Sequence, residues 1–375
     1  MKVEFFRHSL EKSDIENVSS VLNSLFLTTG AVNEEFERRF ASSIGAKETV
    51  TVNSCTAGLH LSLLALGVGP GHEVITTPMT FIATVTTIMH VGATPVFVDA
   101  EDDTGLVDAG KIEAAITPRT KAILPVHLYG TMADMKKIRD IADRHGLRTV
   151  EDSAHCIEGE RDGVRPGQLS EAACFSFYAT KNLTCGEGGA VTTNDTELAA
   201  RLRVLRLHGM SKDAINRYHG AYQHWDMVEL GWKYNLDDIH AALLVGQLGS
   251  LDSMWRRREE ISRIYDGAFS TVPEVRIPKV IGKSARHLYT IWVDPKKRDQ
   301  VLHKMHEHKI GVAVNYRSVH NLSFFRKTFG FRPEDFPNAN RIGESTITLP
   351  LYPKLTDSEV EYVIESVKHI LRAAG

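Results

Sequence analysis

Three short segments of the sequence carry residue types that could bind an anion, hold a negative charge and supply an amine nucleophile. Residues 54–58 (SCTAG) are small and open a predicted helix, where free backbone N–H groups and the helix dipole favour an anion. Asp152 ends a predicted buried strand, which is a costly place for a carboxylate unless a cation meets it. Lys181 follows another predicted strand, and a lysine beside an acid and an anion site is a candidate nucleophile.

Each of these features also has an ordinary structural explanation when it is taken alone. Ser54 could simply cap the helix, and Asp152 could be a partly solvated loop acid or a helix cap. Lys181 could lie on the solvated surface, as most lysines do. The functional interpretation therefore depends on a fold that brings the three segments together.

Seven β-rich runs separated by helical patterns predict such a fold. The runs are residues 49–53, 73–77, 94–98, 121–127, 147–152, 173–177 and 189–193. Apolar residues at helical spacing lie between most of them, and this alternation predicts a mostly parallel sheet with helices on both faces. Ligands of such sheets bind outside the carboxyl ends of the strands, so the residues directly after the strands are the candidates for a ligand-binding site.

The rest of the chain predicts a second, smaller unit. The pattern gives a helical stretch at 236–266, an irregular segment near 272–278, a β-like run at 288–293, and helices at 299–309 and 358–371. We therefore predict a large α/β domain over residues 1–245, which includes an N-terminal helical segment. A smaller C-terminal α+β domain is predicted over residues 246–375.

One cofactor, pyridoxal 5′-phosphate (PLP), would use all three chemical segments at once. It needs a lysine for its covalent attachment, a carboxylate that keeps its pyridine nitrogen protonated, and a helix N-terminus for its phosphate. Lys181, Asp152 and residues 54–58 offer these groups. A lysine released by a substrate amine would also be placed to move a proton between carbon atoms.

Segments over nearly the whole chain resemble the DegT/DnrJ/EryC1/StrS family, the nucleotide-sugar aminotransferases of the aspartate-aminotransferase superfamily. The most diagnostic segments are residues 151–155 (EDSAH) and 175–182 (FSFYATKN). The other matching segments are residues 26–30 (FLTTG), 35–37 (EFE), 53–61 (NSCTAGLHL), 80–84 (TFIAT), 92–99 (GATPVFVD), 231–239 (GWKYNLDDI) and 349–353 (LPLYP). The resemblance implies an α/β, aspartate-aminotransferase-like fold (PLP fold type I) with a mostly parallel seven-stranded sheet in the large domain.

The resemblance also implies cofactor-binding roles. Lys181 would carry the cofactor, Asp152 would pair with its pyridine nitrogen, and His155 would lie beside its phenolic oxygen. The remaining implied contacts are stacking by Phe81, phosphate binding by Thr56, Ala57 and Ser176, and a contact of Asn235 with the neighbouring subunit's cofactor phosphate. Such sharing implies a homodimer whose active sites need both subunits. From the residues alone, Phe81 also fits a core aromatic and Asn235 a helix cap.

Substrate contacts are implied for residues in four parts of the chain, namely Thr29, Tyr178, Lys233, Arg317 and His320. Two positions depart from the family pattern. Cys55 stands where the family often has glycine, and Asn315 stands where it often has histidine. Because only His320 keeps the pattern of that C-terminal loop, we expect Arg317 to contact a phosphate or a carboxylate instead.

Two further segments favour a ketone at carbon four of the sugar. Relatives that act at carbon three commonly read Asn-Ser-Arg where this chain reads Lys233-Tyr234-Asn235, and residues 207–213 (LHGMSKD) also resemble the carbon-four group. We expect a transaminase that moves an amino group from L-glutamate to a nucleotide-diphosphate-linked 4-keto sugar, giving 2-oxoglutarate and a 4-amino-4-deoxy sugar nucleotide. The alternatives are a 3-keto nucleotide-sugar or keto-inositol aminotransferase, and a PLP-binding sensor without turnover.

The composition argues against several other classes of protein. The 375 residues carry a net charge of −3 with 42% apolar residues, which is typical of a globular protein and unlike a basic nucleic-acid binder. No apolar run approaches the ~20 residues of a membrane span, and the first residues lack a secretory h-region. The four cysteines have no metal-ligand spacing. We expect a cytoplasmic protein with reduced thiols, no metal, and no nucleic-acid or membrane partner.

Overall fold

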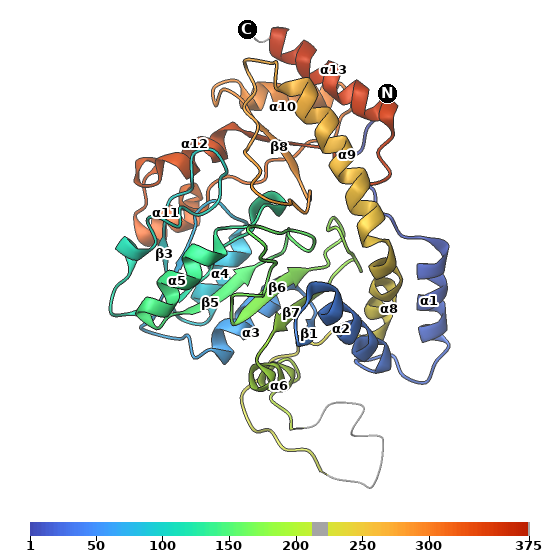
Figure 1. Cartoon of the computed structure of the whole chain (residues 1–375), viewed down its shortest axis with the longest axis vertical. Coiled ribbons are helices and arrows are strands. Elements are labelled where there is room, and N and C mark those ends of the chain that lie inside the picture. The colour runs from blue at the N-terminus through green and yellow to red at the C-terminus, as the bar shows by residue number, and fades with distance from the viewer. Residues whose placement is uncertain (212–223, 374–375) are drawn as a thin grey trace.

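A computed structural model describes residues 1–211 and 224–373, and its largest element is a seven-stranded sheet (Figure 1). The order is β1-β7-β6-β5-β4-β2-β3. β7 is antiparallel to both of its neighbours and every other pair is parallel. The bounds are β1 Glu48–Val52, β2 Glu73–Thr76, β3 Thr94–Phe97, β4 Thr120–Ile123, β5 Arg148–Asp152, β6 Ala172–Ser176 and β7 Gly189–Thr193. The predicted α/β fold class is confirmed.

The strand predicted over residues 121–127 is shorter than expected. β4 ends at Ile123, and beyond it an isolated bridge joins Val126 to Asp152. Pro125 has no N–H to donate, so its backbone can only accept, as it does from the Asp152 N–H at 2.9 Å. The prediction was therefore wrong for the last residues of this run.

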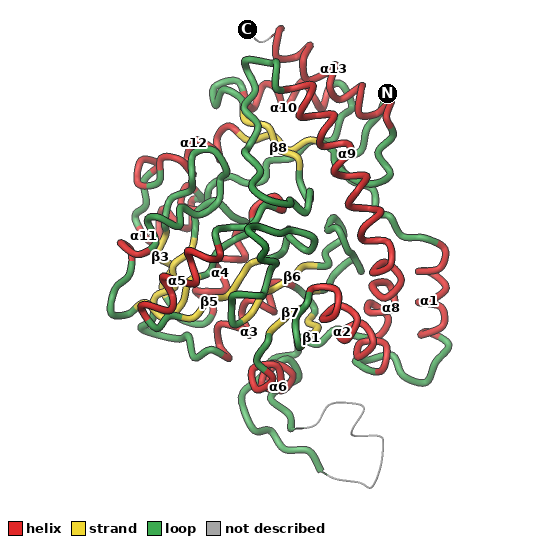
Figure 2. Tube along the Cα trace, viewed as in Figure 1, coloured by secondary structure: helices red, strands yellow, loops and turns green. Residues whose placement is uncertain are grey.

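Helices cover both faces of the sheet, as Figure 2 shows by the red elements around the yellow strands. Those of the larger unit are α1 Lys12–Leu22, α2 Ala31–Ile44, α3 Cys55–Ala65, α4 Ile82–His90, α5 Met135–His145, α6 Thr196–Leu205 and α8 Asp238–Gln247. Side chains alternate between the faces of a strand. In β6, Cys174 belongs to the core that contains α3 and α6, whereas Ala173 and Phe175 belong to the core that contains α2 and α8.

A two-stranded antiparallel sheet organises the C-terminal unit. It consists of β8 Tyr289–Trp292 and β9 Thr346–Leu349, packed with α9 Leu251–Phe269, α10 Arg298–Glu307 and α13 Asp357–Ala373 around one hydrophobic core. Two further helices, α11 Ser323–Phe329 and α12 Pro337–Ser345, lie toward the large sheet (Figure 1). The helical stretch predicted at 236–266 is divided into α8, a 3-10 turn at Leu248–Ser250, and α9. Gly249 lies in this turn, and glycine is a poor helix former.

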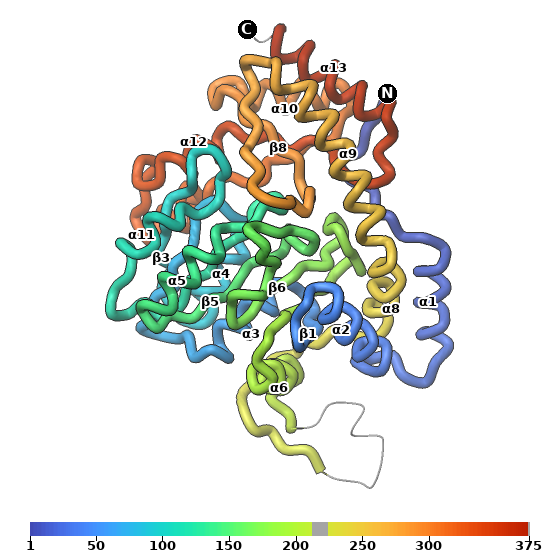
Figure 3. The backbone as a smooth tube through the Cα atoms, in the orientation of Figure 1, coloured from blue at the N-terminus to red at the C-terminus, as the bar shows by residue number. Residues whose placement is uncertain are grey.

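The first residues of the chain pack on the C-terminal unit. Val3 bridges to Ile310 and belongs to the hydrophobic core of that unit, and Arg7 pairs with Glu359 of α13 at 2.7 Å. Figure 3 shows this proximity of the two ends of the chain. The domain boundary at residue 245 stays a prediction.

Lys212 and Asp213, the last residues of the segment that favours carbon four, lie outside the described residues. Within residues 1–211 and 224–373, no helix is both long enough and apolar enough to cross a bilayer.

Candidate active site

A cavity of about 450 Å³ opens where β5 and β6 end and α3 begins, and the C-terminal unit closes its other side. Its lining includes Thr56, Asp152, His155, Ser176 and Lys181. The three segments that the sequence singled out therefore meet at the carboxyl ends of the parallel strands, as expected for an α/β sheet. Phe81 and Tyr178 also line the cavity, and both are about half exposed.

Lys181 is held in the loop that follows β6, where its backbone N–H donates to the Tyr178 carbonyl at 2.9 Å. Burial lowers the pKa of its amine to about 8, while the negative charge of Asp152 acts in the opposite direction. The amine therefore loses its proton more readily than that of an exposed lysine. Its Nζ lies 3.5 Å from Nε2 of His287.

Asp152 is a buried carboxylate with both oxygens engaged. Thr84 Oγ1 of α4 donates to its Oδ2 at 2.7 Å, and the backbone N–H of Ala154 donates to its Oδ1 at 3.1 Å. The Thr84 hydroxyl is itself hydrogen-bonded to Thr80 Oγ1 at 2.7 Å. This shell fixes the carboxylate on the cavity wall, where it can meet a cationic or N–H group.

His155 has one ring nitrogen on a backbone amide and the other on a phenol. The Tyr129 N–H donates to its Nδ1 at 3.3 Å, so a neutral ring carries its proton on Nε2 and donates it to Tyr316 Oη at 3.0 Å. Burial, together with the charge of Lys181, holds the pKa of His155 well below its ordinary value, which keeps the ring neutral.

The start of α3 lines one end of the cavity, and a helix N-terminus is a place that favours an anion. Ser54 Oγ accepts the N–H of Ala57 at 3.1 Å and caps the helix, and the other N–H groups of a first helical turn have no partner within the helix. A Cβ at Gly189 would lie 2.5 Å from Cys55 N, so only glycine lets β7 approach so closely. The site thus offers a hydroxyl-rich phosphate cradle, a carboxylate and an amine, which is the set of groups that PLP requires.

Six of the predicted site residues do not line this cavity. Ala57 is buried, with its N–H already on Ser54. His320 is fully buried and its ring meets Phe336 edge-on at 5.0 Å, so the structure places it in a hydrophobic cluster rather than in the cavity. Arg317 is exposed and lies 3.6 Å from Glu344, and Lys233 takes part in a backbone bridge with Leu207.

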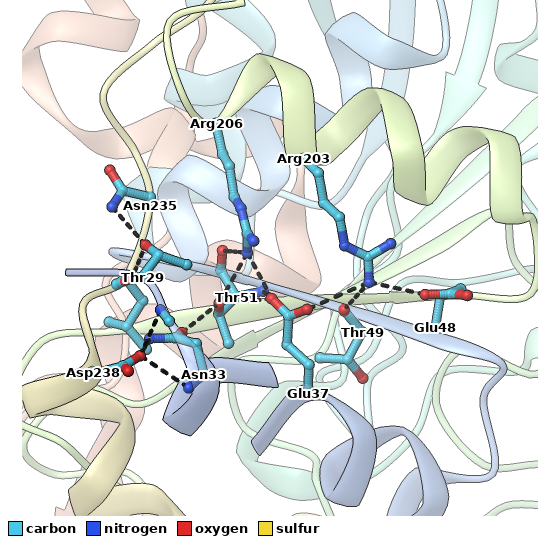
Figure 4. A network of polar contacts seen from close by, with 12 residues as sticks. Thr29, Asn33, Glu37, Glu48, Thr49, Thr51, Arg203, Arg206, Asn235 and Asp238 are labelled. Atoms are coloured by element: carbon cyan, nitrogen blue, oxygen red, sulfur yellow. Dashed lines mark hydrogen bonds and ion pairs between the residues drawn. The ribbon is translucent and has the colours of Figure 1, made fainter. Parts of the chain in front are cut away.

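Thr29 and Asn235 form a second polar group outside the cavity. Asn235 Nδ2 donates to Thr29 Oγ1 at 2.7 Å, and Thr29 Oγ1 donates to the Leu236 carbonyl. Figure 4 shows this pair beside the buried network in which Asp238 accepts the N–H of Gly30 at 2.8 Å. The network anchors the start of α2 and fixes the backbone on which Thr29 and Asn235 lie.

Glu37 is the centre of the same network (Figure 4). Arg206 Nη1 donates to its Oε1 at 2.6 Å, as does the Thr51 N–H at 2.8 Å. Burial by itself raises the pKa of Glu37, but the charges of Arg206 and Arg203 and the Thr51 hydrogen bond together hold it below its ordinary value. The carboxylate is therefore ionised and paired, which links α2, β1 and α6 behind the site.

The cavity contains residues to which the sequence reasoning gave no role. His287, Tyr316 and Asn315 come from the C-terminal unit, and Thr84 supports Asp152 from α4. Asn315, which departs from the family pattern, marks the loop that contains Tyr316, but no pattern in the sequence points to His287. Its proximity to Lys181 arises from residues 106 positions apart.

The chain is similar to known sugar aminotransferases in sequence and in structure. The model of the DegT/DnrJ/EryC1/StrS aminotransferase family matches residues 8–368. The spore coat polysaccharide biosynthesis protein SpsC of Bacillus subtilis is 46% identical over 97% of this chain and 95% of its own length. Spr1654 from Streptococcus pneumoniae, assigned as a sugar aminotransferase and solved in its PMP form, superposes with a TM-score of 0.94 at 33% identity over 100% of both chains. PseC from Helicobacter pylori, an aminotransferase of pseudoaminic acid biosynthesis, gives a TM-score of 0.91 at 30% identity, also over 100% of both chains.

Proposed function

Because the chain belongs to the DegT/DnrJ/EryC1/StrS aminotransferase family, we propose that it transfers an amino group from L-glutamate to the ketone at carbon four of a nucleotide-diphosphate-linked sugar. It is a sugar aminotransferase, and its cofactor is PLP, as in the Spr1654 protein solved in its PLP form. The single observation that carries the proposal is the meeting of Lys181, Asp152 and the start of α3 in one cavity.

We assign the residues of this cavity to the parts of the cofactor. Lys181 would hold it covalently, Asp152 would pair with its ring nitrogen, and Thr56 and Ser176 would bind its phosphate with the first amides of α3. Phe81 supplies an aromatic face on the cavity wall, and its ring centroid lies 5.5 Å from that of Tyr316. The N–H of Ala57 donates to Ser54 Oγ, so Ala57 contributes to the helix cap and has no N–H left for the phosphate.

The chemistry follows from the protonation of these side chains. Bound PLP supplies a conjugated ring that accepts the electron pair left when a proton leaves the carbon next to the amine. Lys181 Nζ takes and returns this proton, and its lowered pKa of about 8 provides a neutral fraction near physiological pH. Asp152, held by Thr84 and Ala154, would pair with the ring nitrogen of bound PLP. The neutral His155 donates from Nε2 and holds Tyr316 over the cavity.

We also propose that the active form is a homodimer in which the partner completes the site. Phe81, Ile82 and Tyr178 are exposed apolar side chains at or beside the cavity mouth. A second exposed apolar group lies next to Thr29 and Asn235 in the sequence, consisting of Leu25, Leu27, Met227, Val228 and Leu230. Apolar side chains exposed in groups are typical of protein interfaces. A partner that covers them would bring its Asn235, Thr29 and Lys233 toward the cavity, in which those of the same chain take no part.

The carbon-four assignment rests on the Lys233-Tyr234-Asn235 segment, and the alternatives differ in substrate or in turnover. A 3-keto sugar or keto-inositol aminotransferase would show the same half-reaction with glutamate. A PLP-binding sensor would bind the cofactor without passing its amino group onward. Product analysis with 4-keto and 3-keto nucleotide sugars separates the first two, and turnover separates the third.

The test is spectroscopic. Purified protein should show the absorbance band of bound PLP, and glutamate should shift this band while one equivalent of 2-oxoglutarate is released. Borohydride reduction should attach the cofactor permanently to the peptide that contains Lys181. Lys181→Ala should lose this attachment, whereas Lys137→Ala, which removes an exposed lysine of α5, should keep it. A band indifferent to every amino acid would overturn the transaminase assignment.

A further inference from the structure

His287 faces the amine of Lys181, and the mechanism described so far gives it no part. It lies just before β8 in the C-terminal unit, is 5% exposed, and lines the cavity beside Lys181. Its Nε2 lies 3.5 Å from Lys181 Nζ, and its ring centroid lies 4.5 Å from that of His155. The question is which of these two nitrogen atoms, Nε2 or Nζ, offers the proton.

The neighbouring Asn182 decides the tautomer of His287. Asn182 Nδ2 donates to Glu158 Oε2 at 3.0 Å and to the Ala285 carbonyl at 2.9 Å, so both of its amide protons are used. Its Oδ1, which can only accept, lies 3.1 Å from His287 Nδ1. Nδ1 must therefore carry the proton, and a neutral ring then presents a lone pair at Nε2. If the Asn182 amide were reversed, its oxygen would lie beside Glu158 Oε2 and the Ala285 carbonyl, which are both acceptors.

A buried ion pair holds Asn182 in this orientation. Arg258 of α9 donates to Glu158 Oε1 at 2.5 Å, and the exposed fractions of the two side chains are 2% and 8%. Leaving either charge unpaired in such a place is strongly unfavourable. The chain of contacts therefore runs from Arg258 through Glu158 and Asn182 to His287, and it ends at the amine of Lys181.

Burial and the surrounding positive charges keep His287 neutral. Burial is the main cause that holds its pKa well below the ordinary value, and the positive charges of Lys181 and Arg258 act in the same direction, as does His155. Asp152 and Cys55, the other groups that act on Lys181, favour its charged form. The neutral imidazole therefore keeps its single proton on Nδ1 and accepts a hydrogen bond at Nε2 instead of taking up a second proton.

We propose that His287 is a positioning residue for Lys181, which accepts a hydrogen bond from the lysine amine through Nε2 and is kept in the Nδ1–H tautomer by Asn182, Glu158 and Arg258. The proposal rests on the proposed function only in the role given to Lys181. The contact directs Nζ into the cavity and stabilises its charged form against burial. Its loss should therefore lower the pH at which Lys181 gives up its proton.

The test measures Lys181 directly in the full-length protein freed of cofactor. The rate at which its amine is methylated by formaldehyde and cyanoborohydride, followed by peptide mass spectrometry across pH, reports its pKa. In the wild type the midpoint should lie near the pKa of about 8. His287→Phe removes the acceptor and should lower the midpoint by about one pH unit. His287→Gln keeps an acceptor within reach and should restore most of the difference.

Two further variants separate positioning from general damage to the fold. Asn182→Ala removes the acceptor that keeps the proton of His287 on Nδ1. It should lower the midpoint of Lys181 methylation as His287→Phe does, but by a smaller amount. His60→Gln changes a buried histidine that packs on Trp232, and it should leave the midpoint unchanged. Nitrogen-15 NMR of labelled histidine should find the proton of His287 on Nδ1. A midpoint unchanged in His287→Phe, or a proton on Nε2, would overturn the proposal.

The role proposed for His287 and the proposed transaminase function can fail separately. If borohydride fixes the cofactor to a different lysine, the assignment of Lys181 fails while the midpoint shift can still be present. If Lys181 carries the cofactor and the midpoint does not move, the role of His287 fails while the transaminase assignment remains. In the loaded enzyme, His287→Phe should also shift the pH profile of the glutamate half-reaction, and His287→Gln should restore it.

Discussion

Thr84→Val should weaken the amine transfer without unfolding the protein. Thr84 is fully buried in α4, and its Oγ1 donates to Asp152 Oδ2 at 2.7 Å. Valine has nearly the same shape but no donor, so the substitution leaves one carboxylate oxygen without its hydrogen bond. The Thr80 hydroxyl, which now bonds to Thr84, would also lose its partner.

The magnitude follows from the kind of hydrogen bond that is lost. A hydrogen bond to a charged group contributes about 1.5–3 kcal/mol. If the full amount supports the transition state, the rate falls by roughly 10- to 150-fold, because each ~1.4 kcal/mol is a factor of ten. We expect a loss in this range for kcat/KM of the glutamate half-reaction.

The assay compares two variants of the same helix. Thr87 is also fully buried in α4, but its hydroxyl donates to the backbone carbonyl of Thr84 at 3.0 Å and does not contact Asp152. Thr87→Val should therefore keep kcat/KM within a few-fold of the wild type, although it loses a buried hydroxyl hydrogen bond to an uncharged carbonyl. Stopped-flow absorbance with glutamate measures both variants. If Thr84→Val and Thr87→Val lose activity equally, the support of Asp152 by Thr84 is not part of catalysis.

Two further predictions concern the buried network and the shared site. Glu37→Gln leaves Arg206 without its buried partner charge and should lower the free energy of unfolding, measured by urea titration, by about 3–5 kcal/mol. The control Glu48→Gln removes a partly exposed charge and should lower the free energy of unfolding by less than about 1 kcal/mol. Because the pKa of folded Glu37 lies below its ordinary value, its stabilisation is complete above the unfolded pKa of about 4.3 and is lost as the pH falls through the folded value. Glu37→Gln should therefore flatten the loss of stability below pH 4, and an equally steep loss in that variant would contradict the assignment. Mixing inactive Lys181→Ala and Asn235→Ala chains should restore about a quarter of the wild-type activity. Half of the dimers are then mixed, and each mixed dimer has one complete site. No recovery of activity after verified subunit exchange would argue against active sites shared between subunits.

Local patterns were sufficient for most of the fold. The predicted run at 189–193 coincides with β7, and those at 49–53 and 173–177 differ from β1 and β6 by one residue at each end. Short buried strands and amphipathic helices express their periodicity within a few residues, so the chain itself reports them. The prediction failed where a single residue changed the local rule, as Pro125 did at the end of β4.

The site was predictable where function follows strand ends and unpredictable where it depends on distant loops. Asp152 ends β5 and Lys181 follows the neighbouring β6, so the topology of a parallel sheet brings them together. His320 and Arg317 were selected by a pattern in one loop, yet the packing of that loop buries His320 and turns Arg317 toward Glu344. Loop conformation depends on contacts made by the whole fold, and the pattern carried none of that information.

The sequence by itself determined the sheet, the family and the three groups that would serve PLP, because these depend on periodicity and on residue types next to strand ends. Only the tertiary structure decided how the amine of Lys181 is held, since Asn182, His287 and Arg258 meet across two units of the chain. The physical reason is the short range of hydrogen bonds, which act over about 3 Å between atoms that no spacing in the sequence relates. The protonation of His287 follows from those contacts and from burial, which are properties of the folded chain alone.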